Sequence, residues 1–533
     1  MQRKTLLVLL LLAVPFGLAA QEPKVLTVDS SSPLLEVKVM VKAGSAADPA
    51  GLEGLAYLTG RLLLEGSYGD PKKPVSKEQL AEITRPWGEG AYPRVRVSKE
   101  TTTLSVTIPR EVFTEYVARV LRPLFTQPLF ASAELDRVRK ETLEEIRSDL
   151  RFQQIELLGL LALDNDIHNG TSYAHLTSGT VRGLEQVKSE SVRGFYRTWY
   201  RPENLALAVS TKDAAIVTGL RDALASIGQS TGEATPLSAR AVEAPAPVTG
   251  RHVTIVGLPK AIATGLHAGF PLPVTRADAD YWPLYVANVW FGTHRDSFSH
   301  LYQVIREERG HNYGDYSYVE YFDSRPQHLF PPTNTPRHYQ YFSIWIRPIG
   351  NEYAHYLLKA LTWELDNLVR NGLTAEQVEA AKNKARVLYL SLAENVDRLV
   401  GYQLDDEFYG LTPGYLDQYL ARIDAVTPEA VNAAIRKYLQ AENIRYVVVT
   451  DQGLAEKLAD DIASNRNVRG KTPKEYQLDS EQREGVPYWL VPEGRLKTLQ
   501  QDAVWKAYRL DIPRSKIRII KAEQMFETAA MPQ

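Results

Sequence analysis

Two hydrophobic periods alternate along the chain, one of two residues and one close to 3.6 residues. Residues 34–42 alternate apolar and polar side chains, which predicts a half-buried strand. Residues 52–63 carry leucines mostly three or four positions apart, which predicts a helix with one buried face. The same criteria predict further strands at 95–108 and 205–209 and further helices at 112–124 and 133–150. The first half of the chain is therefore predicted to be an α+β domain.

The second half repeats this order of elements and, in part, the residues themselves. Its predicted elements are strands near 253–256, from Tyr313, from Gln340 and at 444–449, and helices at 277–290, through Ile305, at 352–371 and at 375–397. Residues 187–209 align with residues 426–448 without a gap. The identical pairs include Val187 and Val426, Glu190 and Glu429, Arg197 and Arg436, and Asn204 and Asn443. Matches at that many fixed offsets indicate an internal duplication.

The chain divides into two domains and an extension. Residues 230–251 are rich in proline, alanine and small polar side chains, which predicts a linker. This linker separates a predicted N-terminal domain, 27–229, from a predicted C-terminal domain, 252–455. Residues 456–533 are predicted to be an extension that packs on the C-terminal domain, with a last strand around 517–520. A length of 533 residues agrees with more than one domain.

The first 20 residues predict an export signal. Arg3 and Lys4 precede a short apolar run, and small residues follow at 17–20; the run is too short for a stable membrane span. The chain has no cysteine, which excludes a disulfide framework and a lipid-modified N-terminal cysteine. We expect an exported, periplasmic protein with no membrane span in the mature chain. Its net charge of −2 does not indicate nucleic-acid binding, and the acidic run 405–407 predicts a solvated face.

Residues 305–317 join a charged helix end to an aromatic strand through Gly310. Helices often end at such a glycine, because it adopts a positive φ without a Cβ clash. Arg306 and Tyr313, seven residues apart, are predicted on either side of this corner. A guanidinium and a phenol placed there are able to bind one carbonyl or carboxylate. The local alternative is a cation in the last helical turn beside a tyrosine of the core.

These features together resemble the pitrilysin/insulinase-type (M16) peptidases. The residues that carry the resemblance are Asn288, Gly292, Leu301-Tyr302, residues 305–310, Tyr313, Ser317 and Pro202-Glu203-Asn204. It extends over roughly residues 27–525. The resemblance implies an α+β fold of two duplicated domains, each a mostly antiparallel sheet packed with helices, which form half of a clamshell.

The zinc site that this family normally carries is degenerate here. In the family, the first helix bears His-x-x-Glu-His, whose histidines bind zinc and whose glutamate activates water. Tyr57 and Arg61 occupy the histidine positions, and Gly60 occupies the glutamate position. A phenol with a pKa near 10 and a permanent guanidinium cation do not replace neutral imidazoles at neutral pH. Only the distal carboxylate has a counterpart, Glu145 or its neighbour Glu144, and Glu145 is a candidate partner for Arg61.

The resemblance implies a catalytically incomplete subunit with no metal of its own. Arg306 and Tyr313 match an Arg–Tyr pair that, in active members, holds the substrate backbone opposite zinc and stabilises oxyanion charge. We therefore expect a heterodimer with a zinc-bearing homologue that cleaves peptides in a closed chamber. One alternative is a purely structural or interaction subunit without a role in cleavage. Another is a hydrolase with an unrecognised site.

Overall fold

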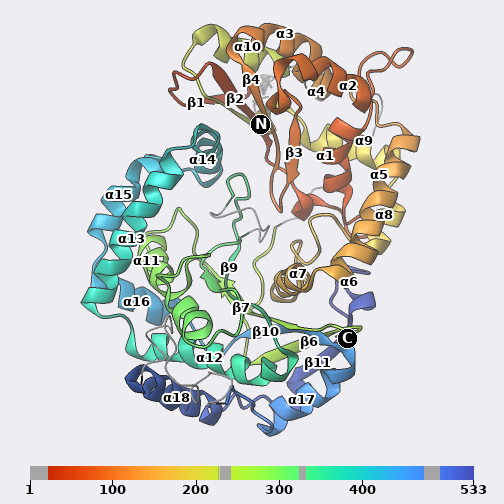
Figure 1. The fold of residues 1–533 in the computed structure, drawn as a ribbon. Helices are drawn as coiled ribbons and strands as arrows, with labels where there is room; N and C mark the ends of the chain where they lie inside the picture. The colour runs from red at the N-terminus through yellow and green to blue at the C-terminus, as the bar shows by residue number, and fades with distance from the viewer. Residues whose placement is uncertain (1–21, 226, 228–241, 323–331, 473–491, 533) are drawn as a thin grey trace, which may run out of the picture.

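A computed structural model of the protein describes residues 22–225, 227, 242–322, 332–472 and 492–532. The predicted export signal and residues 230–241 of the predicted linker lie outside the described residues. Two β-sheets, one from each half of the chain, form the centres of two α+β bodies (Figure 1). No helix in the described ranges is long and apolar enough to cross a membrane.

The first sheet has the strand order β1-β5-β2-β4-β3. Its strands are β1 Lys24–Thr27, β2 Leu34–Val41, β3 Arg94–Val97, β4 Thr102–Pro109 and β5 Leu205–Val209. The predicted strand β2 is present, but it is not half-buried. Val37 and Val39 lie in the core of the first half, and on the opposite face Lys38 and Met40 are also buried, Met40 in a cluster that includes residues of helix α14, Val396–Tyr409. The helices of this half are α1 Leu55–Glu65, α2 Lys77–Thr84, α3 Phe113–Tyr116, α4 Arg122–Thr126, α5 Ser132–Glu144, α6 Arg151–Gln153, α7 Ile155–Ile167, α8 Val181–Gln186, α9 Ser189–Trp199 and α10 Ala214–Leu224.

The second sheet has the order β11-β6-β10-β7-β9-β8. Its strands are β6 His252–Leu258, β7 Thr264–Leu272, β8 Asp315–Tyr318, β9 Gln340–Ile349, β10 Arg445–Asp451 and β11 Ile517–Lys521. Its helices are α11 Tyr281–Gly292, α12 Ala354–Asn371, α13 Ala375–Ala393, α14 Val396–Tyr409, α15 Tyr415–Ala425, α16 Pro428–Tyr438, α17 Ala455–Ser464 and α18 Pro492–Ala507.

The two sheets share one topology once β11 is set aside. In each, the first strand pairs in parallel with the last strand of the domain, and the other three pairings are antiparallel. There are two large hydrophobic cores: one is centred on the first half and extends to residues of β6 and β10, and the other lies within the second half. The predicted fold class, two duplicated and mostly antiparallel α+β domains, is confirmed, whereas the exact domain boundaries stay predictions.

Helix α7 joins the two halves. Residues 157–163 of this helix are all apolar or glycine, which is typical of a helix buried on more than one face. It belongs to the first half but packs on β7 and β10 of the second sheet, and it lies between the bodies in Figure 1. Gly159 allows this contact, since a Cβ there would lie 2.3 Å from Nδ1 of His267. The halves are thus packed together rather than only linked.

Helix α14 makes a second contact between the halves and overturns one prediction. The acidic run 405–407 was expected to be solvated, but α14 packs its carboxylates against other elements. Asp405 accepts a hydrogen bond from the Asn334 backbone N–H at 2.9 Å and lies 3.5 Å from the Arg276 guanidinium. Burial raises the pKa of Asp405 to about 7. Glu407 pairs with Lys42 of the first sheet at 3.2 Å.

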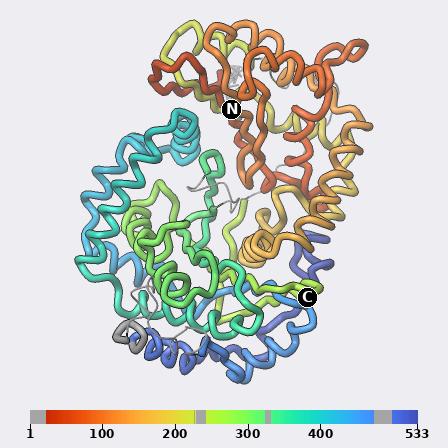
Figure 2. The backbone as a smooth tube through the Cα atoms, in the orientation of Figure 1, coloured from red at the N-terminus to blue at the C-terminus, as the bar shows by residue number. Residues whose placement is uncertain are grey.

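The C-terminal extension packs on both halves, not only on the predicted C-terminal domain. Strand β11 pairs in parallel with β6, as a last strand was predicted to do. The chain then crosses to the first half, where Met525 and Phe526 are buried in its core. The backbone N–H of Val181 donates to the Phe526 carbonyl at 3.0 Å. This blue end of the chain lies beside the orange helices in Figure 2.

Candidate functional site

Helix α1 carries the three positions at which the zinc motif was expected. Its first turn is fixed by Asp48, whose carboxylate accepts hydrogen bonds from the backbone N–H groups of Gly54 and Ala56, both at 2.7 Å. Burial raises the pKa of Asp48 to about 8. The helix buries its leucines in the first core and turns Tyr57 and Arg61 toward a cavity.

Arg61 is surrounded by carboxylates. Its Nε donates to Glu65 at 2.7 Å, its Nη2 lies 3.0 Å from Glu141, and its Nη1 lies 3.7 Å from Glu145. The Arg61–Glu145 ion pair suggested by the sequence is therefore present, although Glu65 is the closer partner. Burial alone would lower the pKa of Arg61, but the hydrogen bond to Glu65 and the surrounding negative charge leave it above its ordinary value. A guanidinium fills the place between these acids.

Gly60 faces the sheet at close range. A Cβ on Gly60 would lie 2.7 Å from Cγ2 of Val97 and 3.2 Å from Cγ1 of Val95. Real Cβ contacts are not found at 2.7 Å, and valine is stiff at χ1, so the neighbours have little room to move. A glutamate at this position requires α1 and β3 to separate.

This contact gives a stability prediction for Gly60. In an exposed helix, Gly→Ala raises stability by about 1 kcal/mol, but Gly60→Ala is expected to lower it by about 1–3 kcal/mol through overpacking. The measurement is urea unfolding followed by circular dichroism. Gly219→Ala in α10 is the matched control. A Cβ on Gly219 would lie 3.2 Å from a ring carbon of Phe113, a less crowded contact than the 2.7 Å at Gly60, so this variant should lose less stability. Equal or greater stability of Gly60→Ala would contradict the close packing.

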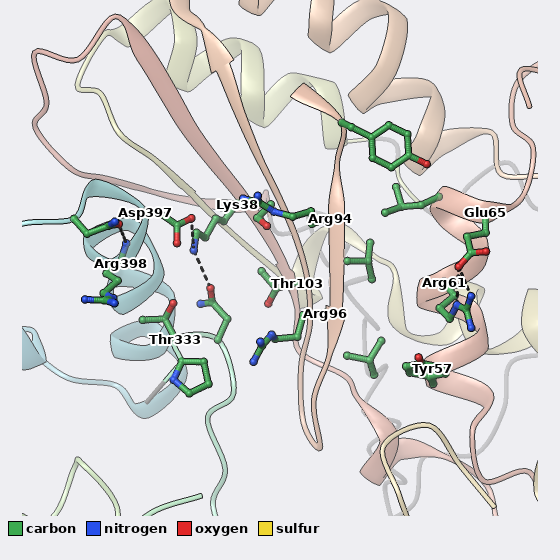
Figure 3. A pocket seen from close by; sticks show the side chains of 18 of the residues that line it. Lys38, Tyr57, Arg61, Glu65, Arg94, Arg96, Thr103, Thr333, Asp397 and Arg398 are labelled. Atoms are coloured by element: carbon green, nitrogen blue, oxygen red, sulfur yellow. Dashed lines mark hydrogen bonds and ion pairs between the residues drawn. The ribbon is translucent and has the colours of Figure 1, made fainter. Parts of the chain in front are cut away.

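The cavity beside α1 has a volume of about 840 Å³ and extends around the edge strand β3. In Figure 3, Tyr57, Arg61 and Glu65 lie on one side of β3, and Lys38, Arg94, Arg96 and Thr103 lie on the other. Thr333, Asp397 and Arg398 of the second half close that other side. Lys38 connects the two halves here, with its Nζ 3.0 Å from Asp397 and 3.4 Å from Oδ1 of Asn334.

The Arg306–Tyr313 corner lies in the second half. Arg306 belongs to a π-helical segment, Tyr302–Glu307, which is followed by Gly310 at a φ of +58°. The Arg306 guanidinium lies over the Tyr302 ring, 4.5 Å from its centroid, and 3.2 Å from Glu307. Tyr313 is 77% exposed. The alternative of a core tyrosine is therefore wrong.

His311 and Asn312 hold the corner in place, a role that the sequence did not indicate. The Asn312 Nδ2 donates to Asp315 at 2.7 Å and to the Arg347 carbonyl at 3.0 Å. The His311 ring meets the Tyr353 ring edge-on, with 4.8 Å between centroids. Burial raises the pKa of Asp315 well above its ordinary value. The two residues before Tyr313 are thus anchored while Tyr313 itself projects outward.

The structure does not bring the two sets of residues together in one cavity. Within the described part of the chain, neither Arg306 nor Tyr313 lines the cavity beside α1. The corner instead adjoins the start of α7, because Arg347 pairs with Glu156 at 2.6 Å. The corner and the degenerate helix are separate surfaces of this chain.

Two family profiles match the sequence. Residues 24–160 match a profile described as insulinase, peptidase family M16, and residues 186–385 match one described as the peptidase M16 inactive domain. Together these segments account for more than half of the chain. The chain belongs to the M16 peptidase family. The first profile lies within the first half of the fold, and the second begins before α9 of the first half and extends into α13 of the second half.

Relatives of this M16 chain agree with that assignment. An uncharacterized zinc protease of Streptomyces coelicolor is 27% identical over 266 residues, 49% of this chain and 53% of that protein, so the chain spans about half of that relative. The solved peptidase M16 inactive domain from Pseudomonas fluorescens has a TM-score of 0.67 at 21% identity and covers 81% of this chain and 96% of its own. The Escherichia coli periplasmic protease PqqL has a TM-score of 0.59 at 13% identity over 87% of this chain and 50% of its own.

Zinc does not fit the residues that this M16 chain has at the expected site. Arg61 is a permanent cation in the midst of the acids that would be needed as ligands, and Gly60 has no side chain to activate water. No group of three or more His, Asp or Glu side chains in the described ranges is arranged to hold a metal. No catalytic step through zinc is derived for this chain.

Sequence reasoning missed the cationic side of the cavity. Arg94 and Arg96 alternate with Val95 and Val97 on a short edge strand. That period-two pattern was available in the sequence, and it places both arginines on one face of the sheet. Their proximity to α14 of the second half depends on the packing of the two domains, which no local pattern gives.

Proposed function

We propose that this M16 chain is a catalytically incomplete subunit that pairs with a zinc-bearing M16 homologue. Arg306 and Tyr313 bind the substrate backbone next to the scissile bond and stabilise the oxyanion that forms there. Zinc and the catalytic base belong to the partner. The pair works as an exported, periplasmic peptidase, in keeping with the basic and apolar segment at the start of the sequence.

The main support for this proposal is the solvent exposure of Tyr313 next to an anchored backbone. Tyr313 has 77% of its surface exposed, so its phenol is accessible to a ligand or a partner. Its backbone lies between Asn312, which makes two hydrogen bonds, and Gly314, so the position is fixed although the ring is free. Oxyanion stabilisation requires a donor in a fixed position. The anchored backbone supplies part of that position, and closure of the partner over the Tyr313 ring supplies the rest.

The fold comparison supports the pairing of two such chains. The solved PqqL chain is matched over only 50% of its length, whereas this chain is covered over 87%. One unit of this size therefore corresponds to half of a longer M16 fold. An M16 homologue on a second polypeptide is the natural complement of the half that lacks a metal site.

The proposal predicts activity only from the mixture. The chain, a homologue with His-x-x-Glu-His and a 1:1 mixture are each assayed with a quenched fluorescent peptide library. We expect no cleavage by the chain alone, weak cleavage by the homologue and fast cleavage by the mixture. The purified chain should contain far less than one zinc per molecule by plasma mass spectrometry.

Complex formation is measured in parallel by size-exclusion chromatography with light scattering, with serum albumin replacing the chain as the control. A 1:1 complex without faster cleavage would favour a purely structural subunit. Absence of a complex, or one tightly held zinc in the isolated chain, would contradict the proposal directly.

A further inference from the structure

A second cavity, of about 230 Å³, lies within the second half of the fold, beside α11. Its lining residues belong to α11, α13, α14, α15 and β8 and to adjoining loops, and α11, α13 and α15 lie together on one flank of the second sheet (Figure 1). Much of the wall is apolar or aromatic and includes Tyr285, Val289, Phe322, Leu388, Leu392 and Tyr415. An apolar cavity of about 150 Å³ holds benzene. The cavity beside α11 is therefore large enough for one aromatic ring with a short chain.

Two hydrogen-bond donors that line this cavity have no partner. Tyr402 is only 3% exposed, and its hydroxyl makes no hydrogen bond with any described residue. The Asn288 amide oxygen accepts a hydrogen bond from the Ser317 hydroxyl at 2.7 Å, but the amide nitrogen makes none within the described part of the chain. Buried polar groups are normally hydrogen-bonded. Both donors are therefore available to a ligand in the cavity.

One cation of the cavity has no counter-charge. The acids in and next to the cavity already lie near other cations, Glu320 at 3.0 Å and Asp405 at 3.5 Å from Arg276, and Asp296 at 2.5 Å from Lys384. Arg295 lines the cavity and is exposed to solvent, and it makes no hydrogen bond or ion pair in the ranges that the structure describes. An anionic group on a ligand is thus able to pair with Arg295 without breaking an existing ion pair.

Arg295 and Tyr402 lie in different parts of the cavity. Arg295 follows His294, whose Nδ1 lies 2.6 Å from the Tyr318 hydroxyl. Burial raises the pKa of Tyr318 well above its ordinary value, and the charge of Arg295 opposes that rise, so the guanidinium lies on the Tyr318 side. Tyr402 instead stacks on Tyr415, with 5.4 Å between ring centroids. The cavity thus has an exposed cationic side and a buried aromatic side with a free hydroxyl.

From these observations we infer that the cavity beside α11 binds a small aromatic carboxylate, either a free acid or the last residue of a peptide. The aromatic ring occupies the apolar part of the cavity, and the carboxylate pairs with Arg295 at the exposed side. Asn288 and Tyr402 donate hydrogen bonds to oxygens of the ligand. This site uses neither Arg306 nor Tyr313, and it does not depend on a zinc-bearing partner.

The test uses the full-length mature chain alone, with isothermal titration calorimetry as the measurement. We expect para-hydroxyphenylpropionate to bind at least about tenfold more tightly than its amide, which has the same ring but no charge. The tripeptide alanyl-alanyl-tyrosine, with a free or an amidated carboxyl end, distinguishes the two sources of the ligand. Tight binding of the free-ended tripeptide identifies a peptide end, whereas tight binding of the small acid alone identifies a free acid.

Variants assign the binding to this cavity. Arg295→Gln is expected to weaken the acid about tenfold and to leave the amide unchanged, because only the acid pairs with the guanidinium. Tyr402→Phe should weaken para-hydroxyphenylpropionate several-fold but not phenylpropionate, which has no oxygen on its ring. Leu388→Trp should abolish binding by filling the cavity. Val387→Trp on the same helix is the matched control, since Val387 is 56% exposed and does not line the cavity.

Three results would overturn the inference. The first is equal binding of the acid and the amide, and the second is full affinity in Leu388→Trp with an unchanged melting temperature. The third is equal weakening of the acid and the amide by Arg295→Gln, because the guanidinium would then act through the structure and not through a carboxylate. No measurement here includes the zinc-bearing homologue, so failure at this site and failure of the proposed heterodimer are distinguishable.

Discussion

Tyr313→Phe and Arg306→Ala are each expected to lower kcat for peptide cleavage by the reconstituted pair about 10²- to 10³-fold. The change in Tyr313 removes one hydroxyl from a ring that is 77% exposed, so folding should not be affected. Among the described residues, the Arg306 guanidinium pairs with Glu307 and stacks on Tyr302, and its charge also opposes the rise that burial causes in the pKa of Asp315. Both groups act on charge that develops in the transition state, so the loss should appear in kcat and in kcat/KM together.

Two control variants accompany this experiment. Tyr389→Phe removes a phenol from α13, and Arg370→Ala removes an exposed cation that pairs with Asp366 on α12. Neither should change the cleavage rate by more than about twofold, since surface substitutions away from a site have small effects. If all four variants cleave at the original rate, this chain has no role in the chemistry. A rise in KM with kcat unchanged would assign the pair to ground-state binding only.

The helices and strands were largely predictable from the sequence, because the hydrophobic patterns that determine them are local. The alternation in residues 34–42 and the leucine spacing in residues 52–63 correctly predict a strand and a helix. The alternation did not predict that the polar face of β2 is also buried, because α14 of the second half covers it. The duplication was visible because residues 187–209 and 426–448 align without a gap, and these segments form the corresponding helix and strand of each half, α9 with β5 and α16 with β10. The topology of the two sheets then repeats strand by strand.

The features that the sequence did not predict depend on contacts between distant segments. The acidic run 405–407 has the composition of a surface, but α14 packs between the halves and buries Asp405. Likewise, the last residues return to the first domain because Met525 and Phe526 fill its core. Residues separated by hundreds of positions make these contacts, and no periodic pattern records them. The cationic side of the cavity beside α1 arises in the same way.

A buried ionic cluster joins the two halves and is central to their packing. Asp164 on α7 is 2% exposed and receives two hydrogen bonds from the Arg337 guanidinium, at 2.9 and 3.3 Å. Lys99, from the turn between β3 and β4, lies 3.9 Å from the same carboxylate, and His168 lies 3.0 Å from it. Burial alone would raise the pKa of Asp164, but the charge of Arg337 and the hydrogen bond from His168 hold it below its ordinary value. One carboxylate therefore balances two buried cations.

Asp164→Asn is expected to destabilise the protein by about 3–5 kcal/mol, because it leaves Arg337 and Lys99 buried without a counter-charge. In the wild-type protein, Asp164 makes its full contribution to the free energy of unfolding at a pH above its unfolded-state pKa of about 3.9. That contribution declines only as the pH falls below this value. Titration of Asp164 itself therefore does not change the loss between pH 6 and pH 8. Burial lowers the pKa of Lys99 to about 8 and the charge of Asp164 raises it, so the pKa of Lys99 should fall further in the variant and the loss should be smaller at pH 8 than at pH 6. Urea unfolding at several pH values, followed by tryptophan fluorescence and circular dichroism, measures both effects.

A double variant distinguishes the effect of the Asp164–Arg337 ion pair from that of side-chain packing. Asp164→Leu combined with Arg337→Met replaces the close ion pair by apolar side chains and should recover part of the loss, whereas either change alone should not. Glu115→Gln breaks an exposed pair with Arg119, both side chains being about half exposed, and should cost no more than about 0.5 kcal/mol. If Asp164→Asn costs as little as Glu115→Gln, the cluster does not hold the halves together. In that case the apolar contacts of α7 with β7 and β10 must fix the position of the second half, and with it the shape of the cavity beside α1.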